Sequence, residues 1–207
     1  MIAVIDYSMG NLKSVSKAIA KVGGEVIVTA DPRVAREAKG IVLPGVGAFA
    51  QGIRNLKTRG FLPLLSAWDK TDKPLLGLCL GMHLLFTEGE EGGLHRGLNL
   101  IHGRVKRLPD TVKVPHMGWN QVTLGKDGGD DPFLQGIASG SFFYFAHSYY
   151  ADPDESGVVA GRTDYGIHFA SIVRRDRTLG VQFHPEKSDR IGLSLLANFV
   201  RLTNGKP

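Results

Sequence analysis

The first part of the chain alternates between short apolar runs and longer stretches whose apolar residues recur at helical spacing. The run 2–6 is apolar at consecutive positions, which is typical of a strand buried on both faces of a sheet. The predicted strands are 2–6, 25–29, 41–43 and 74–78, and the predicted helices are 12–22 capped by Asn11, a short helix from Asp31-Pro32, and 49–70 with breaks near Gly60 and Pro63. This alternation predicts an α/β fold with a flavodoxin-like, doubly wound, mostly parallel sheet.

The second half changes character, because its predicted strands follow one another with only turns between them. The glycine-rich stretch from Gly125 to Gly129 is predicted to be a turn and not a phosphate-binding loop, since no helical pattern follows it at once. A closing helix begins near Ser188. The predicted strands are 101–107, 112–114, 120–124, 142–150, 157–163, 167–173 and 178–183. We expect an antiparallel extension of the sheet together with strands that complete its parallel part, all within one domain over 1–207.

Composition and charge narrow the classes of protein that the chain could belong to. Its 207 residues are 43% hydrophobic and 22% charged, as in ordinary soluble globular proteins. No apolar run approaches the roughly 20 residues that cross a bilayer, and the N-terminus is predicted to be a strand and not a signal peptide. The net charge of +5 is mild and the basic residues are scattered, which favours a solvated surface over nucleic-acid binding. A single cysteine excludes an intramolecular disulfide and indicates a cytoplasmic protein.

That cysteine, Cys79, lies in the sequence Gly77-Leu78-Cys79-Leu80-Gly81, between an apolar strand and a predicted helix over 82–86. This is the pattern of a nucleophile elbow, with cysteine in place of serine. The glycines are needed at those spacings because the turn is too tight for a Cβ. The sulfur would lie beside a helix N-terminus, whose partial positive charge lowers the pKa of a cysteine. Read alone, the motif leaves open that Cys79 is a small buried apolar residue.

A second stretch supplies a base for this nucleophile. His184 ends an apolar strand, and Glu186 comes two positions later. Side chains two apart in an extended segment point the same way, so Glu186 can orient the imidazole while its other ring nitrogen faces the sulfur. We therefore predict a catalytic triad of Cys79, His184 and Glu186.

A glycine-rich segment at the end of the third predicted strand can complete such a site. The backbone N–H groups of Gly45 and Val46, with that of Leu80, are predicted to form an oxyanion hole. The implied chemistry is acyl transfer through a thioester, and the residues leave open an amidase, a thioesterase or a peptidase. The other histidines show no metal-ligand spacing, and we expect neither a metal nor a cofactor.

These segments resemble the class I, or triad-type, glutamine amidotransferases over nearly the whole chain. The match is closest to the branch that works with a cyclase in histidine biosynthesis. The motifs that carry the resemblance lie in residues 5–12, 43–49, 77–82, 115–120, 145–149 and 180–188.

The resemblance implies that the substrate is L-glutamine, which is hydrolysed to glutamate and ammonia. It implies that Cys79 attacks the side-chain amide, that His184 protonates the departing ammonia, and that Glu186 orients His184. The residues that it implies as glutamine contacts are Gly47, His83, His147, Ser148 and Tyr149.

The resemblance also implies a partner. Family members of this branch form a heterodimer with a (β/α)8-barrel cyclase, to which the ammonia passes. The positions that match this joint are Asn11, Trp119, Tyr144 and Lys187. We expect the subunit to be nearly idle alone, with a backbone N–H of residues 45–47 turned away until the partner's ligand shifts the population.

One position departs from the family pattern, because His83 stands where the family usually has glutamine. An imidazole can still make one hydrogen bond, so we expect glutamine binding to survive. We also expect titration of His83 to add a pH effect near 6.5. Two rival hypotheses are a stand-alone cysteine amidase or peptidase on the same sheet, and a catalytically silent binding subunit.

Overall fold

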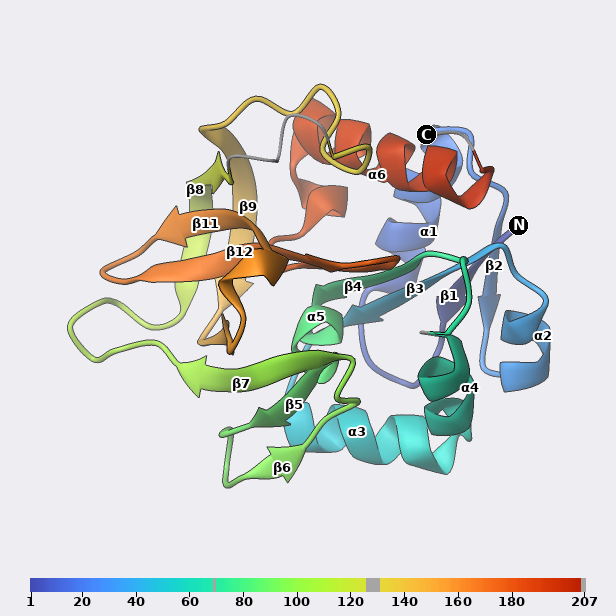
Figure 1. The fold of residues 1–207 in the computed structure, drawn as a ribbon, viewed down its shortest axis with the longest axis horizontal. Helices are drawn as coiled ribbons and strands as arrows, with labels where there is room; N and C mark the ends of the chain where they lie inside the picture. The colour runs from blue at the N-terminus through green and yellow to red at the C-terminus, as the bar shows by residue number, and fades with distance from the viewer. Residues whose placement is uncertain (69, 126–130, 206–207) are drawn as a thin grey trace.

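The computed structural model describes residues 1–68, 70–125 and 131–205. At its centre lie five parallel strands of the described chain, in the order β2-β1-β3-β4-β13 (Figure 1). They are β1 (Ile2–Ile5), β2 (Val26–Thr29), β3 (Gly40–Gly45), β4 (Leu75–Cys79) and β13 (Thr178–Val181). This is the flavodoxin-like 2-1-3-4-5 order, with its fifth strand supplied from near the end of the chain. The predicted fold class is confirmed.

Helices cover both faces of this parallel part, which explains why its strands are apolar at consecutive positions. On one face lie α1 (Leu12–Lys21) and α6 (Asp189–Thr203), and on the other lie α2 (Pro32–Arg36), α3 (Phe49–Thr58) and α4 (Phe61–Trp68) (Figure 1). The side chains of β1 divide accordingly. Val4 belongs to the core cluster that contains Phe199 of α6, whereas Ile5 belongs to the cluster that contains Leu56 of α3.

The second half of the chain extends the sheet with mainly antiparallel pairs, as predicted. From β13 the sheet continues through β12 (His168–Arg175), β10 (Tyr149–Pro153), β7 (Ile101–Arg107), β5 (Phe86–Gly89) and β6 (His95–Arg96). A branch leaves β12 through β11 (Val159–Asp164) to β8 (His116–Leu124) and β9 (Ser141–His147). Short 3-10 helices, η2 (Ser156–Val158) and η3 (Pro185–Lys187), complete the described elements.

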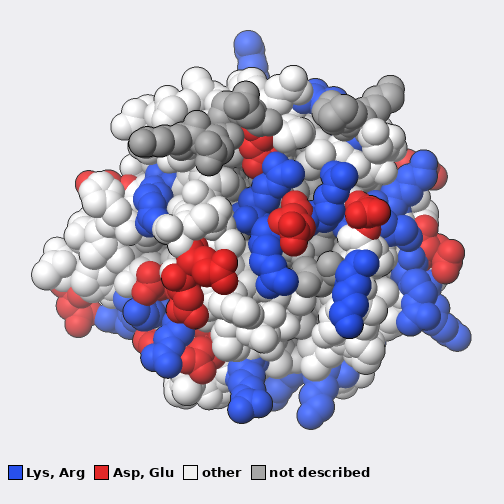
Figure 2. All heavy atoms as spheres, in the orientation of Figure 1, with Lys and Arg blue, Asp and Glu red and all other residues white. Residues whose placement is uncertain are grey.

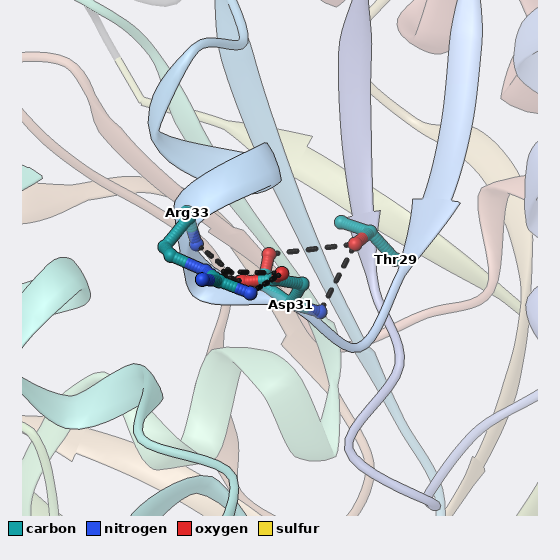
Figure 3. Close-up of polar contacts among 3 residues, drawn as sticks. All are labelled: Thr29, Asp31 and Arg33. Carbon is teal, nitrogen blue, oxygen red and sulfur yellow. Dashed lines mark hydrogen bonds and ion pairs between the residues drawn. The ribbon is translucent and has the colours of Figure 1, made fainter.

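Side-chain caps fix the start of two helices where the sequence predicts them. Asn11 Oδ1 accepts a hydrogen bond from the backbone N–H of Ser14 at 3.2 Å, and so begins α1. At the end of β2, Asp31 Oδ1 accepts from the backbone N–H of Arg33 at 2.9 Å, with Pro32 at the first helical position of α2 (Figure 3). Hydrogen bonds from Arg33 lower the pKa of the Asp31 carboxyl below its ordinary value.

Several predicted elements differ from the structure. The predicted helix over 82–86 is Leu80–Leu84, called α5, and Phe86 begins β5 instead. Neither β5 nor β6 was predicted, because the apolar run 84–86 does not distinguish a helix from a strand. No strand forms over 112–114, and the predicted strand 142–150 is two strands, β9 and β10, that separate at Ser148.

Other boundaries shift for local reasons. The predicted helix 49–70 divides near Gly60 into α3 and α4, and Pro63 lies in the first turn of α4, where a proline needs no backbone donor. The predicted strand 120–124 begins earlier, at His116. The turn predicted beyond Gly125 lies outside the described residues.

The surface mixes charges of both signs. Figure 2 shows acidic side chains interspersed among the basic ones over the face in view. Among the helices of the described residues, none is long and apolar enough to span a membrane.

Candidate active site

Cys79 is the last residue of β4 and directly precedes α5. Its φ of 52° and ψ of −109° are strained values for a residue with a side chain. A Cβ on Gly77 would lie 2.7 Å from the backbone of Gly81, and a Cβ on Gly81 would lie 1.7 Å from the carbonyl oxygen of Leu43. The turn therefore requires glycine at both positions, as the elbow motif predicts.

His184 lies between Cys79 and Glu186 and hydrogen-bonds to both side chains. Its Nδ1–H donates to Glu186 Oε1 at 2.9 Å, which leaves Nε2 for the sulfur. Only 2% of the Glu186 side chain is exposed, and within the described structure its second oxygen, Oε2, has no hydrogen-bond partner. The three residues of the predicted triad thus meet in space.

The neighbours of His184 favour its charged form. Burial by itself lowers the pKa of His184, but the hydrogen bonds to Cys79 and Glu186 and their negative charges outweigh burial and raise that pKa from 6.5 to about 10. His184 therefore carries a proton at neutral pH, as an imidazolium paired with the sulfur and the carboxylate.

The backbone around His184 differs in one respect from the predicted extended segment. β13 ends at Val181, and Glu186 lies in the 3-10 helix η3. The contact between His184 and Glu186 is therefore made across a tight turn. Hydrogen bonds hold this turn in place: the backbone N–H of His184 donates to Tyr144 O at 2.9 Å, and Ser188 Oγ donates to His184 O at 2.7 Å.

Cys79 opens onto a cavity of about 390 Å³. All five predicted glutamine contacts line it, together with Val46 and Leu80 of the predicted oxyanion hole. Those five are Gly47, His83, His147, Ser148 and Tyr149. The cavity is also lined by Glu91, whose Oε2 accepts a hydrogen bond from the backbone N–H of Phe49 at 2.8 Å. The prediction from sequence did not include Glu91.

Gly45 is not among the residues that line this cavity. It pairs with Cys79 across β3 and β4, and a Cβ there would lie 2.4 Å from Tyr7 Oη and 2.8 Å from Leu80 Cβ. Tyr7 Oη donates to Pro44 O at 2.7 Å and holds the end of β3 in place. Gly47 follows with a φ of 102°, a conformation that favours glycine.

His83 has an environment that the sequence did not predict. Its Nε2 lies 2.7 Å from Gln182 Oε1, and the Nε2 of the same Gln182 side chain donates to Cys79 Sγ at 3.8 Å. Burial lowers the pKa of His83 from 6.5 to about 4. The expected titration of His83 near 6.5 is therefore wrong, because a buried imidazole beside a neutral carboxamide stays uncharged.

Two further buried histidines, His116 and His147, bind each other, and His147 lines the cavity. His147 Nδ1–H donates to Tyr149 O at 2.8 Å, so His147 Nε2 is the acceptor for His116 Nδ1–H at 2.9 Å. Asn120 Nδ2 then donates to His116 Nε2 at 3.2 Å. Burial lowers the pKa of His147 to about 3 and that of His116 to about 4. Both rings are neutral, and each has a defined tautomer.

Three of the four predicted partner residues lie together. Trp119 and Tyr144 are cross-strand neighbours on β8 and β9 with ring centroids 6.3 Å apart, and Lys187 Nζ lies 5.7 Å from the Tyr144 ring centroid. Trp119 is 49% exposed, and Met117 and Phe142 on the same hairpin are also exposed. The fourth residue, Asn11, caps α1.

Two contacts of the site were missed in the sequence analysis. Gln182 precedes His184 by two positions, so the alternation of an extended strand was the signal that both side chains face Cys79. The pairing of His116 with His147 depends on the register of β8 and β9, which no local pattern reveals. Within the residues that the structure describes, no group of three His, Cys, Asp or Glu side chains could hold a metal ion.

This combination of a flavodoxin-like sheet, an elbow cysteine and a His–Glu pair is that of a glutamine amidotransferase. The sequence model for glutamine amidotransferase class-I matches residues 3–202, and the chain belongs to this family. Within the family it groups with the HisH subunits of imidazole glycerol phosphate synthase. The Moorella thermoacetica subunit HisH is 51% identical over 201 residues, covering 97% of this chain and 94% of the relative. The Archaeoglobus fulgidus subunit HisH is 48% identical over 203 residues, covering 98% of each.

Solved structures of low sequence identity share the fold. A crystal structure of a glutamine amidotransferase superposes with a TM-score of 0.77 at 17% identity, covering 99% of this chain and 100% of the other. The structure of PurLQS from Thermotoga maritima gives a TM-score of 0.69 at 16% identity, with 99% and 97% covered.

Proposed function

We propose that this chain is the glutaminase subunit of an imidazole glycerol phosphate synthase, with Cys79, His184 and Glu186 as its catalytic triad. The observation that carries the proposal is the contact of a strained cysteine, an imidazolium and a buried carboxylate beside one cavity. Family membership supports glutamine as the substrate.

The first half-reaction forms a thioester. The Cys79 thiolate adds to the side-chain amide carbon of glutamine, whose carbonyl oxygen becomes an oxyanion. His184 gives its Nε2 proton to the amide nitrogen, the C–N bond breaks, and ammonia leaves. The raised pKa of His184 keeps this proton in place until the amide nitrogen gains basicity in the tetrahedral intermediate.

The second half-reaction restores the enzyme. Neutral His184 takes a proton from water, and the resulting hydroxide adds to the thioester carbon. The C–S bond then breaks, glutamate leaves, and the thiolate–imidazolium pair forms again. Glu186 holds the ring through Nδ1 in both steps and stabilises its charged form.

Backbone donors stabilise the oxyanion in this proposal. The N–H of Leu80 follows the nucleophile directly, and the N–H groups of Gly45 and Val46 belong to the adjacent strand end. Gly47, at a φ of 102°, gives this segment the freedom to turn a peptide group. We propose that one N–H of residues 45–47 faces away at rest and turns toward the oxyanion when the partner is liganded.

The remaining lining residues suit the amino-acid end of glutamine. The Glu91 carboxylate can pair with the α-ammonium group, while His147, Ser148 and Tyr149 surround the α-carboxylate. The His147 ring is neutral at working pH and brings no additional charge to this end of the cavity, while both of its nitrogens stay bonded to Tyr149 O and His116.

The family of subunits to which the chain belongs implies a partner subunit. We propose that this partner is a (β/α)8-barrel cyclase and that it docks on Trp119, Tyr144 and Lys187, with Asn11 at the edge. Met117 supports this location, because it lies on the exposed apolar side of the β8–β9 hairpin and also lines the cavity. Ammonia released at Cys79 would leave next to the partner.

The decisive assay measures glutamate release by the chain alone, with the cyclase, and with the cyclase and its nucleotide ligand. We expect low turnover alone and a large rise with the liganded partner. Cys79→Ala should abolish glutamine-dependent synthesis by the complex and leave synthesis from added ammonium salts intact. Equal turnover in all three conditions would favour a stand-alone amidase. If Cys79→Ala abolished synthesis from ammonium salts as well as from glutamine, the synthase reaction would not be confined to the cyclase, contrary to the proposal.

A separate variant tests the docking surface. Trp119→Ala should weaken the complex about tenfold or more, because exposed aromatic side chains dominate interface energies. The matched control is Leu94→Ala, which removes an apolar side chain near β6 that is more exposed, at 63%, than Trp119 at 49%. Equal affinities of both variants for the cyclase would rule out the proposed surface.

A further inference from the structure

His83 and Gln182 lie 99 positions apart in the sequence and form a buried pair against the nucleophile. Gln182 is fully buried, and its carboxamide connects the His83 ring to the sulfur: Oε1 faces His83 Nε2 at 2.7 Å, and Nε2 faces Cys79 Sγ at 3.8 Å. His184 reaches the same sulfur from two residues further along the chain. Gln182 therefore occupies a position next to the reacting atom.

The orientation of the Gln182 carboxamide decides whether its N–H or its oxygen faces the Cys79 sulfur. With its Nε2–H toward the sulfur, Gln182 donates a hydrogen bond that stabilises a thiolate. In the reverse orientation, its oxygen would face the thiolate and destabilise it. No charge holds the carboxamide in place, so its orientation depends on its other neighbour, His83.

We infer that His83 is a positioning residue for the nucleophile: its Nε2–H binds Gln182 Oε1 and so directs the Gln182 amide N–H to the Cys79 sulfur, where it stabilises the thiolate. This inference rests on the proposed function, since it assigns a new role at the same cysteine. It also gives His83 a purpose at the position where the resemblance leads one to expect glutamine, because a glutamine side chain there can donate the same hydrogen bond.

The neighbouring titratable groups leave this arrangement undisturbed at neutral pH. Burial lowers the pKa of His83 to about 4, so its ring is neutral and one nitrogen carries the proton. His147 is neutral for the same reason. Burial raises the pKa of Tyr7 far above its ordinary value, so its hydroxyl stays protonated. His184 and Glu186 form the ion pair on the other side of the sulfur, and Glu91 lines the cavity.

The test measures the rate at which iodoacetamide alkylates Cys79, the only cysteine, across a pH series on the whole chain without glutamine or partner. Gln182→Met removes the donor at nearly constant shape, and we expect the midpoint of the profile to rise by about one pH unit. His83→Phe frees the carboxamide and should raise the midpoint as well. His83→Gln restores a donor and should return the midpoint to its original value.

The double variant separates positioning from an independent effect. If His83 acts through Gln182, then His83→Phe adds nothing to the midpoint in the Gln182→Met background. Matched controls are His102→Phe and Gln51→Met, which make the same changes on the exposed surface and should leave the midpoint unchanged. The thermal midpoint of each variant reports folding and is not expected to follow the alkylation midpoint.

An unchanged midpoint in Gln182→Met would overturn the inference, as would additive shifts in the double variant or a His83→Gln midpoint as high as that of His83→Phe. Because alkylation needs neither glutamine nor a partner, these results are independent of the glutaminase assay. A chain with all the predicted shifts but no glutaminase activity would reject only the proposed function. Normal glutaminase activity without any shift would reject only the role of His83.

Discussion

The active site holds its buried histidines in two opposite charge states. His184, between Cys79 and Glu186, is the charged side of the site, and His83 and His147, which line the cavity, are its neutral side. His184 is 5% exposed, and His83 and His147 are each 6% exposed, so the three rings are almost equally buried. The pKa of His184 nevertheless rises to about 10, whereas the pKa of His83 falls to about 4 and that of His147 to about 3. Burial therefore does not decide the charge of a histidine in this site.

The partners of each ring decide it. His184 faces a carboxylate and the Cys79 sulfur, whose hydrogen bonds and negative charges hold a proton on the ring against the cost of burial. His83 faces a carboxamide, and His147 faces a backbone carbonyl and another neutral imidazole. The difference teaches that His184 is suited to proton transfer, while His83 and His147 position their neighbours through uncharged hydrogen bonds of fixed direction.

The largest effect is expected from removing the charge behind His184. Glu186→Gln keeps the shape but loses the anion, so the pKa of His184 should fall and the partnered complex should lose glutaminase activity by about 10²–10⁴-fold. The control is Asp189→Asn, which neutralises an exposed acid three residues away. A Glu186→Gln complex that kept more than half of the activity would show that glutaminase activity does not need the charge on His184.

The neutral side predicts a loss of stability in acid. His83 has a folded pKa of about 4, below its value of about 6.5 in the unfolded chain, so the unfolded state takes up its proton first. The contribution of neutral His83 to folding stability is complete above pH 6.5 and is lost as the pH falls toward 4. Between about pH 7 and pH 4.5, His83→Gln should lose about 2 kcal/mol less stability than the parent chain in urea unfolding.

The same acid titration has an internal contrast. His184 keeps its proton in the folded state throughout, while the unfolded chain completes protonation of this residue as the pH falls below about 6.5. The contribution of His184 therefore has the opposite sign, a gain in stability down to about pH 5.5, and it is the same in both chains. Parallel slopes for the parent chain and His83→Gln would mean that His83 is not neutral in the folded protein.

The smallest of these effects concerns the contact between His116 and His147. His116→Phe preserves the ring that stacks on Tyr165, with centroids 3.9 Å apart, but removes the donor to His147 Nε2. Without this donor His147 can change its tautomer, and we expect the KM for glutamine to rise about tenfold with little change in kcat. A fall in kcat at constant KM would instead connect His116 to the proton-transferring side.

The sequence predicts the charged side far better than the neutral one, for a physical reason. Cys79 lies in a short motif whose two glycines are required by close backbone approaches, and Glu186 is only two positions from His184, so short patterns identify both. The contact between His83 and Gln182 depends on bringing α5 against the end of β13, and that between His116 and His147 on the register of a hairpin. Such contacts belong to the tertiary structure and leave no local pattern.

The errors in the fold have the same origin. Each of the five parallel strands overlaps a predicted strand, because a short apolar run marks it in the sequence. The sequence of 82–86 predicts a helix that would include Phe86, the first residue of β5, since the strand character of β5 comes from pairing with β7 and not from its own sequence. The division between β9 and β10 likewise follows from their different partners, β8 and β7.

The most direct test of the account is a ¹⁵N NMR titration of the histidine rings in the whole chain, with Glu186→Gln and His83→Gln to assign the signals. The account predicts that His184 keeps protons on both ring nitrogens through about pH 8, while His83 and His147 keep a single ring proton down to about pH 5. A His184 ring that loses its proton near pH 6.5, like a solvated histidine, would contradict the charged triad on which the proposed chemistry depends.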